Sequence, residues 1–210
     1  MLEGVTGPVL DVGGLPGRLQ GPVPGVKVVT ANIEPPAEVV FDGRRLPFDD
    51  DSFDAATSID VLEHLTPSER SGHLGELLRV ARRRVVLCCP VGHPGAEATD
   101  RQQAEWFARL SGRRERYLDE HAANGLPFQA ELDALAAEAP PAWNLTLWFH
   151  GDRRGTVRWF RLGALSHYRR RPGDRLRYAW LWLRTPIDRD LRAESGPHDN
   201  RAYLVARSAP

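Results

Sequence analysis

Short apolar runs alternate with polar or glycine- and proline-containing stretches through the first half of this chain. Runs of strand length that are rich in β-branched residues and bounded by turn-forming residues predict β-strands. The run at 85–91 is apolar throughout, which is typical of a strand buried on both faces. The strands predicted in this half cover residues 9–12, 27–32, 38–41, 53–59 and 85–91.

A helix is predicted between the last two of these strands. Thr66, Pro67 and Glu69 match an N-cap, a first-turn proline and the third residue of a capping box. Apolar residues then recur at helical spacing, and the arginines at 82–84 suit the negative end of a helix dipole. The expected buried face consists of Leu74, Leu77, Leu78 and Ala81.

Strands that alternate with crossover segments predict an α/β fold with a mostly parallel, doubly wound sheet. Two crossovers are trimmed, because residues 18–26 carry several glycines and prolines and residues 34–37 leave no room for a helix. The second half is less regular. It has helical patterns at 101–110 and 129–138, separated by a loop, and strand patterns at 143–150 and 202–207.

Length and composition fit one globular domain over residues 1–210, with 41% hydrophobic and 27% charged residues. The formal net charge is zero, so bulk charge favours no particular partner. Cys88 and Cys89 are neighbours on a predicted strand and point to opposite faces, which does not suit a disulfide. The chain shows no cleavable leader and no membrane-spanning apolar run, so we expect a cytoplasmic protein of undetermined oligomeric state.

Two motifs carry the strongest functional information. Residues 9–17 (VLDVGGLPG) place an acid and glycines directly after a strand. Residues 42–65 (DGRRLPFDDDSFDAATSIDVLEHL) combine an acid, a Leu-Pro-Phe turn and a strand that ends in Asp-Val-Leu-Glu-His. Together these motifs resemble the cofactor half of a class I S-adenosylmethionine-dependent methyltransferase of the type 11 kind, over residues 9–91.

That resemblance implies a Rossmann-like architecture. The cofactor core would cover about residues 1–92, and a helical cap would follow at about 95–128. The strands at 143–150 and 202–207 resemble the closing antiparallel hairpin of the methyltransferase sheet. An inserted helical lid at about 152–200 would separate these two strands.

The resemblance also implies which residues bind S-adenosylmethionine. Asp11 would orient the glycine loop or meet the methionine ammonium, although Leu15 stands where the usual motif has its middle glycine. After the second strand, Asn32 would accept from the ribose hydroxyls, or Glu34 would reach back to them; Glu34 is equally typical of an exposed loop. Asp42 would accept from the adenine amino group. The implied set is Asp11, Gly13, Gly14, Gly17, Asn32, Ile33, Asp42, Gly43, Ser58 and Asp60.

The segment Asp60-x-x-Glu63-His64 would face both cofactor and acceptor. His64 and Glu63 are the predicted catalytic residues, because a loop histidine can take a proton from a hydroxyl near neutral pH. Alternatively, this pair only orients the following loop, or it binds Mg²⁺ together with Asp60 and His93. The latter idea rests on a resemblance to the Glu-x-x-Glu-His cluster of some O-methyltransferases; here Asp replaces the first Glu, and no metal is assigned. His121 is a candidate pocket residue, with a capping or surface role as its alternative.

The predicted insertion at 152–200 mixes arginines with aromatic residues. Such a mixture is typical of a solvated face over a packed lid, an anionic membrane surface contact, a nucleic-acid site or a protein interface. We favour the first interpretation, place peripheral membrane contact second and give nucleic acid little weight. The layout resembles that of methyltransferases thought to modify glycans or lipid-linked sugars. The expected acceptor is therefore a small molecule or such a glycan.

The predicted function is methyl transfer from S-adenosylmethionine to an unidentified acceptor by in-line displacement, with oxygen preferred as the acceptor atom. One rival hypothesis is a catalytically degenerate protein that binds S-adenosylmethionine or S-adenosylhomocysteine without transfer. Another is an adaptor whose arginine-rich insertion docks on a membrane or a partner.

Overall fold

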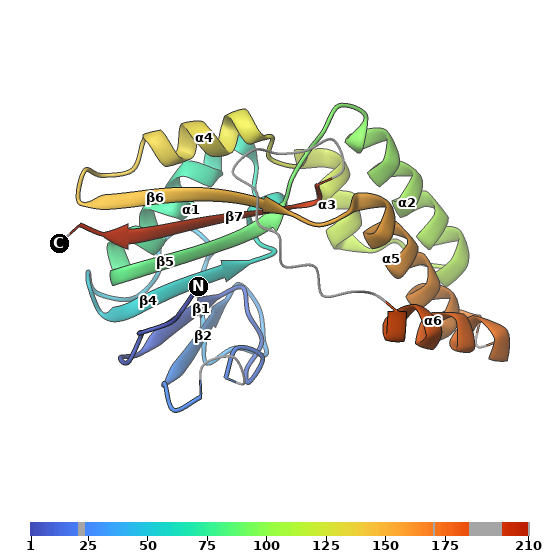
Figure 1. Ribbon diagram of the computed structural model, residues 1–210, viewed down its shortest axis with the longest axis horizontal. Coiled ribbons are helices and arrows are strands. Elements are labelled where there is room, and N and C mark those ends of the chain that lie inside the picture. The colour runs from blue at the N-terminus through green and yellow to red at the C-terminus, as the bar shows by residue number, and fades with distance from the viewer. Residues whose placement is uncertain (21–23, 170, 185–198, 210) are drawn as a thin grey trace.

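The computed structural model describes residues 1–20, 24–169, 171–184 and 199–209, which form one sheet with helices around it (Figure 1). The seven strands of this sheet follow the order β3-β2-β1-β4-β5-β7-β6. Their bounds are β1 (Val9–Val12), β2 (Val28–Asn32), β3 (Val39–Val40), β4 (Phe53–Ile59), β5 (Ala81–Pro90), β6 (Trp143–His150) and β7 (Arg201–Ser208).

Strands β1 to β5 run parallel, and β7 runs antiparallel to both of its neighbours, β5 and β6. This topology confirms the predicted Rossmann-like, mostly parallel sheet with a closing antiparallel pair. Because β1 lies between β2 and β4, the carboxyl ends of these three strands meet at one edge. Ligands of open α/β sheets bind at such an edge.

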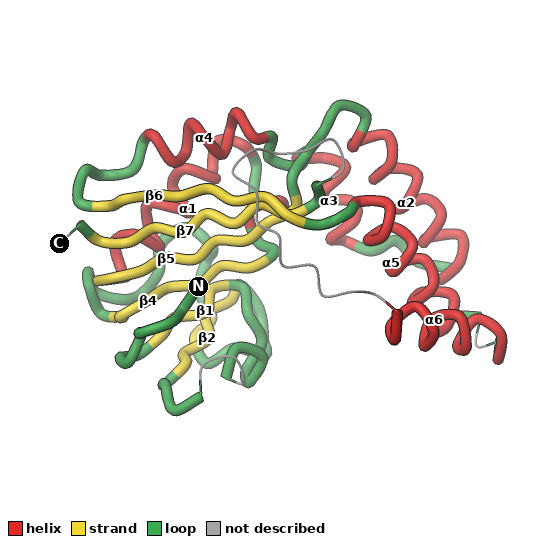
Figure 2. Tube along the Cα trace, in the orientation of Figure 1, coloured by secondary structure: helices red, strands yellow, loops and turns green. Residues whose placement is uncertain are grey.

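The main core lies between the sheet and two helices on one of its faces, α1 (Pro67–Val80) and α4 (Gln129–Ala137) (Figures 1 and 2). Alternate strand residues such as Leu10 and Leu87 point into this core and pack with Leu77 of α1. The predicted start of α1 is confirmed: the Glu69 carboxylate accepts from the Thr66 backbone N–H at 2.9 Å and from its hydroxyl at 2.6 Å.

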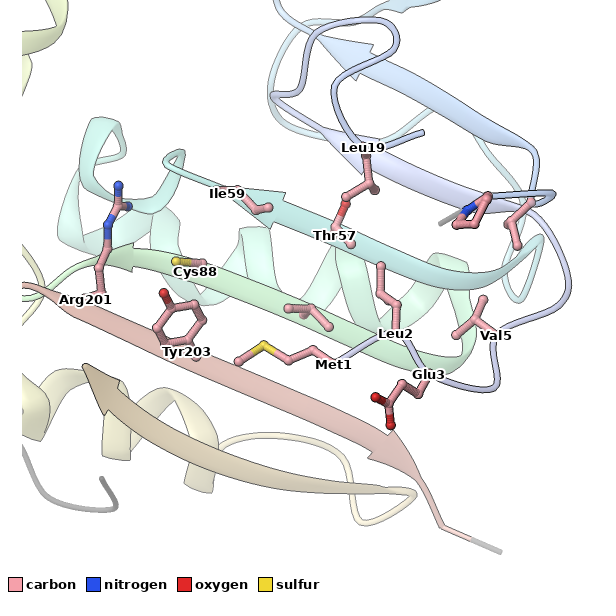
Figure 3. Close-up of a pocket in the computed structure, with 13 residues that line it drawn as sticks. Met1, Leu2, Glu3, Val5, Leu19, Thr57, Ile59, Cys88, Arg201 and Tyr203 are labelled. Carbon is pink, nitrogen blue, oxygen red and sulfur yellow. The ribbon is translucent and has the colours of Figure 1, made fainter. Parts of the chain in front are cut away.

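The opposite face of the sheet has a different cover. Within the described residues, the connections from β1 to β2 and from β2 to β3 contain no helix, which confirms the trimmed crossovers. The N-terminal residues 1–5 and part of the first connection lie over this face instead, around an apolar cavity of about 750 Å³ (Figure 3). Thr57, Cys88 and Tyr203 line the cavity from three neighbouring strands.

Four helices lie beyond the carboxyl ends of the parallel strands (Figure 1). Two of them, α5 and α6, come between β6 and β7 in the chain, within the predicted insertion; its residues 185–198 lie outside the described part. The bounds are α2 (Ala96–Ser111), α3 (Arg116–Asn124), α5 (Arg153–Tyr168) and α6 (Pro172–Arg184).

The structure corrects one predicted helix end. Helix α1 ends at Val80, so Ala81 and the arginines at 82–84 belong to β5 and not to the last helical turn. Their charges meet side-chain and backbone oxygens instead of the helix dipole: Arg82 donates to the Asp54 carboxylate at 2.7 Å, and Arg84 donates to two backbone carbonyls of the N-terminal segment.

The structure also replaces part of a predicted loop by α3. Its sequence is amphipathic but short, and none of its residues is fully buried. The helix packs along α2 and against the short 3₁₀ helix η1 (Leu62–His64), which follows β4.

Candidate functional site

A cavity of about 170 Å³ lies at the carboxyl edge of the sheet, between the ends of β1, β2 and β4 on one side and α3 on the other. Seven of the residues singled out from the sequence line it: Gly13, Asn32, Ile33, Glu34, Gly43, Asp60 and His64. Helix α3 adds Arg116, Tyr117 and Glu120 to the lining. The predicted site residues that do not line the cavity are Asp11, Gly14, Gly17, Asp42, Ser58 and Glu63.

The glycine loop after β1 needs its glycines for two different reasons. Gly13 has φ of +81°, which favours glycine, and its N–H donates to the Ala31 carbonyl at 2.8 Å. Gly14 is required sterically, because a Cβ atom there would collide with the Asp11 carboxylate. The loop is thereby fixed between β1 and β2, with Gly13 at the cavity wall.

Asp11 lies beneath this loop. Its side chain is buried and accepts a hydrogen bond from the Thr57 hydroxyl at 2.8 Å. Burial raises the pKa of Asp11, while the Thr57 hydrogen bond acts in the opposite direction. This placement supports an orienting role for Asp11, which was one of the two roles that the sequence left open.

Asn32 also holds the loop. Its side-chain amide donates to the Gly13 carbonyl at 3.1 Å, and its Oδ1 accepts from the Ile33 N–H at 2.8 Å. Glu34 lies farther along the same wall, half-exposed, and accepts from the Tyr117 hydroxyl at 3.2 Å. Of the two candidates for ribose recognition, Glu34 has the carboxylate on the cavity wall.

Asp42 caps the turn that follows it. Its Oδ1 accepts from the backbone N–H groups of Arg44 at 3.0 Å and of Arg45 at 3.5 Å, and these contacts lower the pKa of Asp42. The turn places Gly43, with φ of +83°, across from Ile33 on the cavity wall.

Ser58 is buried at the end of β4, and its hydroxyl lies 2.9 Å from Nε2 of His73 in α1. His73 lines the cavity, and desolvation lowers its pKa to about 4, so its ring is neutral near pH 7. Ser58 thus contacts the His73 ring, which lines the cavity, and does not line the cavity itself.

The four residues considered from the sequence as a Mg²⁺ site do not come together. Asp60 pairs with the Arg201 guanidinium, and Nε2 of His93 lies 2.5 Å from the Asp199 carbonyl. Within the described residues, the cluster able to bind a metal instead contains Glu63, His64 and His121. Asp60 and His93, which the sequence offered only as an alternative metal set, therefore do not belong to this cluster.

Glu63, His64 and His121 form a compact group behind the cavity. Oε1 of Glu63 lies 4.0 Å from Nε2 of His64 and 3.9 Å from Nε2 of His121. The Glu63 side chain is buried, which raises its pKa to about 8, and desolvation lowers the pKa of His121 to about 4. Burial likewise lowers the pKa of His64, against the opposing effect of Glu120.

A chain of ionic contacts links this group to the cavity wall. Nδ1 of His64 lies 2.9 Å from Oε2 of Glu120, whose other oxygen lies 2.9 Å from Nε of Arg116. Arg116 in turn lies 3.5 Å from the Glu34 carboxylate. Glu34 and His64 are thus joined through two residues of α3.

Arg70 of α1 holds the framework of this group and is itself fully buried. Its Nε donates to the Leu62 carbonyl at 3.2 Å, its Nη1 donates to both oxygens of Glu131 at 2.8 Å, and its Nη2 donates to the Gly125 carbonyl. Arg70 therefore ties η1, the end of α3 and α4 together.

Sequence reasoning singled out His121 but could not place it, and it missed several other functional candidates. A charged residue at a position of α1 that the helical pattern turns inward was the available sign for Arg70. The remaining missed residues are Arg116, Tyr117, Glu120 and Arg201.

Residues 10–89 match the family model described as a methyltransferase domain. This part of the chain is therefore similar to a methyltransferase domain. Within the domain lie the glycine loop, the Asp42 turn and the Glu63–His64 segment. Among curated protein sequences, none matches the chain significantly.

Solved structures show the same fold for nearly the whole chain. Phosphoethanolamine N-methyltransferase 2 from Haemonchus contortus, in complex with phosphomonomethylethanolamine and S-adenosylhomocysteine, has a TM-score of 0.56 and 13% identity; the match covers 98% of this chain and 49% of that one. The plantazolicin methyltransferase BpumL in complex with S-adenosylhomocysteine has a TM-score of 0.53 and 8% identity, with 97% and 76% covered. The [4+2]-cyclase SpnF has a TM-score of 0.51 and 20% identity, with 98% and 75% covered.

At identities of 8–20% these likenesses show the fold alone, so the acceptor has to be inferred from the site itself. In the part of the chain that the structure describes, no helix has the length and apolar character needed to cross a membrane.

Proposed function

We propose that this protein transfers a methyl group from S-adenosylmethionine to a hydroxyl oxygen of its acceptor. The observation that carries the proposal is the cavity at the carboxyl edge, where the glycine loop and the Ile33–Gly43 wall face His64 and Glu120. Two of the solved structures with this fold contain S-adenosylhomocysteine, and residues 10–89 match the methyltransferase family model.

The cofactor would lie with its adenine against the cavity wall formed by Ile33 and Gly43. Asp42 would accept from the adenine amino group through the oxygen that does not cap its turn. Glu34 would accept from the ribose hydroxyls, because its carboxylate lines the cavity while both ends of the Asn32 amide hold the loop. The methionine end would lie beside Gly13, over Asp11.

The reaction requires the acceptor oxygen, the methyl carbon and the sulfur to lie in line. The acceptor hydroxyl loses its proton, its oxygen bonds to the methyl carbon, and the carbon–sulfur bond breaks to leave a neutral thioether. In the metal-free chain the proton acceptor is Nε2 of His64, because the contact of Nδ1 with Glu120 favours a proton on Nδ1. Oε1 of Glu63 lies 4.0 Å from that Nε2 atom.

Calorimetric titration with S-adenosylhomocysteine tests the cofactor part. Glu34→Ala removes a charge-assisted hydrogen bond and is expected to weaken binding about tenfold. Glu105→Ala, on the exposed surface of α2, is the matched control and should leave the affinity unchanged. Absence of binding by the unchanged protein would overturn the proposal.

Release of S-adenosylhomocysteine from S-adenosylmethionine, in the presence of a panel of small phenols, alcohols and amines, tests the transfer. His64→Gln should lower the rate with hydroxyl acceptors by about 10²-fold or more, while His167→Gln should not. A protein that binds the cofactor but transfers to no acceptor would support the rival hypothesis of a binding protein, which the exposed Leu15 in the glycine motif also favours.

The acceptor side offers a second clue. Helices α5 and α6 enclose a groove of about 540 Å³ that combines arginines with apolar side chains. We propose that this groove contacts an anionic lipid surface. Its guanidinium groups would pair with lipid phosphates, and its apolar side chains would contact the acyl chains. A hydroxyl-bearing, lipid-linked acceptor would then approach the cavity from the membrane side. The groove is lined by Arg154, Val157, Arg158, Arg161, Leu162, Leu165, Arg177 and Trp180.

A further inference from the structure

The group formed by Glu63, His64 and His121 has the composition of a metal site. One carboxylate oxygen and two imidazole nitrogens lie within 4.8 Å of one another, and they come from two separate elements, η1 and α3. We infer that these three side chains bind one divalent transition-metal ion.

The unpartnered atoms of the group support this inference. Glu63 is 1% exposed, yet its Oε2 has no hydrogen-bond partner among the described residues. Nε2 of His121 also lacks one within the described part of the chain. Buried polar atoms without partners are costly in a native structure. Oε1 is the Glu63 oxygen nearest to the two histidines, so a shared ion would satisfy Nε2 of His121 directly, and it would satisfy Oε2 of Glu63 when the carboxylate binds through both oxygens.

The surroundings orient the ligands as metal sites usually do. A metal-bound histidine commonly directs its second ring nitrogen to a carboxylate. Here Nδ1 of His64 lies 2.9 Å from Oε2 of Glu120, an ionic contact without hydrogen-bond geometry, and Nε2 lies on the side of Glu63. Arg70 anchors both η1 and the end of α3, which fixes the distance between the two halves of the site.

The donor set determines the class of ion. Two imidazoles and one carboxylate suit Zn²⁺, Fe²⁺, Mn²⁺ or Co²⁺, whereas Mg²⁺ and Ca²⁺ prefer oxygen ligands only. Donors around Zn²⁺ lie about 3.3 Å apart, given bond lengths of roughly 2.0–2.1 Å. The distances of 3.9 and 4.0 Å from Glu63 therefore require a contraction of about 0.6–0.7 Å on binding.

Three protein ligands leave coordination positions for a further oxygen. Because His64 lines the cofactor cavity, an open position faces the space next to the expected methyl donor. An acceptor hydroxyl bound there would become more acidic and release its proton to water, since Nε2 of His64 would then be occupied by the ion. This role rests on the proposed function, whereas binding of the ion does not.

Titration of the tag-free full chain with Co²⁺, followed by visible absorption, tests the site directly. We expect one Co²⁺ ion to bind per chain. The visible absorption bands of the bound ion should be those of Co²⁺ with both nitrogen and oxygen ligands. Glu63→Gln and His121→Gln should each abolish this stoichiometric binding, and Glu120→Gln should weaken it about tenfold. The matched control His167→Gln removes an exposed histidine of α5 and should bind as the unchanged protein does. Mg²⁺ should not compete with Co²⁺.

Three results would overturn the inference. The first is that the unchanged protein binds no stoichiometric Co²⁺, and the second is that Glu63→Gln and His121→Gln bind Co²⁺ as well as the unchanged protein does. The third is that His167→Gln loses as much binding as these two variants. Circular dichroism on the same samples establishes that the variants are folded, and His121→Asp is a second variant that keeps a donor at this position. Binding of S-adenosylhomocysteine is measured in parallel. Cofactor binding without Co²⁺ binding refutes the metal site alone, and Co²⁺ binding without cofactor binding refutes the proposed function alone.

Discussion

Asp60, directly after β4, and Arg201, at the start of β7, form an ion pair across the carboxyl edge of the sheet. Nη2 of Arg201 lies 3.2 Å from Oδ2 of Asp60, and Nη1 contacts the other carboxylate oxygen. Asp60 has φ of +57°, a conformation that aspartate and asparagine tolerate better than most residues. The pair holds the end of β4 against β7. The Asp60 carboxylate therefore stabilises the sheet edge and is not available to bind a metal.

Asp60→Asn should therefore lower stability more than it lowers cofactor affinity. Asparagine keeps the backbone conformation but loses the charge that faces Arg201. Both side chains are partly exposed, so the loss in free energy of unfolding should be about 1 kcal/mol. Urea denaturation measures it, and affinity for S-adenosylhomocysteine should fall less than threefold in calorimetry. A loss of affinity as large as that of Glu34→Ala would show instead that Asp60 binds the cofactor.

Gly14→Ala should destabilise the protein by about 1–3 kcal/mol, because the added methyl group would collide with the buried Asp11 carboxylate. Gly72→Ala is the matched control. Gly72 lies on the exposed face of α1, where a Cβ atom meets nothing within 4 Å, so alanine should stabilise the helix by about 0.5–1 kcal/mol. Thermal unfolding of both variants gives the comparison, and equal effects would contradict the role given to Gly14.

Local sequence patterns predicted the strands of this protein well. Strand β4 covers the residues predicted for it, and the capping box at Thr66 and Glu69 marks the start of α1. The end of α1 was not predictable from the same patterns, because the arginines at 82–84 find their partners, such as Asp54, in segments distant in sequence. Tertiary contacts override local preference at that point.

The candidate site was predictable only in part for the same reason. The cofactor wall follows from the two local motifs, which contain Gly13 and Gly43, and from Ile33 after the second strand, and all three residues line one cavity. The partners of Glu63 depend on α3, a helix without a buried stripe, so spacing in the sequence could not choose His121 over His93.

Arg70→Met should destabilise the protein by about 3 kcal/mol, because it removes a buried guanidinium that joins three elements and leaves Glu131 unpaired. Chemical denaturation measures the loss. The exposed Arg109 in α2 is the control, and Arg109→Met should change stability by less than about 0.5 kcal/mol. If the metal site exists, Arg70→Met should also weaken Co²⁺ binding, since η1 and α3 would separate. A variant as stable as the control would contradict the anchoring role.

The metal-free protein should lose stability as the pH rises from about 6.5 to 8. The pKa of Glu63 is raised from 4.5 to about 8, so the folded state retains a proton that the unfolded state releases, and the stability gained at low pH is lost on approaching pH 8. Besides burial, the nearby charges that act on Glu63 are Asp60, Arg70 and Arg201. The pKa of His121 is lowered from 6.5 to about 4, so the folded state binds this proton less readily than the unfolded state does. The stability that the neutral His121 ring contributes is therefore lost as the pH falls below 6.5.

Between about pH 4.5 and 6.5 these two contributions offset each other, and above 6.5 only that of Glu63 changes. The expected loss from pH 6.5 to 8 is roughly 2 kcal/mol, from urea denaturation with a chelator present. Glu63→Gln should remove this loss, while Glu105→Gln should retain it. An unchanged pH dependence in Glu63→Gln would refute the raised pKa.

The groove between α5 and α6 should bind anionic vesicles. We expect cosedimentation with phosphatidylglycerol vesicles at about 50 mM salt, and release at about 500 mM, because each arginine near the surface contributes about 1 kcal/mol and salt screens the attraction. Arg158→Gln combined with Arg177→Gln should weaken binding at least tenfold, while leaving in place Arg161, which donates to Gln103 at 2.6 Å.

The matched control combines Arg83→Gln with Arg109→Gln, which removes the same charge from exposed positions outside the groove. If both double variants lose binding equally, the attraction is a property of net charge, and the groove has no specific part in it. If the protein binds neutral phosphatidylcholine vesicles as strongly as phosphatidylglycerol vesicles, the apolar side chains of the groove account for binding without the arginines. Loss in the groove variant only, with cofactor affinity unchanged, would establish a lipid-facing acceptor side next to an intact cofactor cavity.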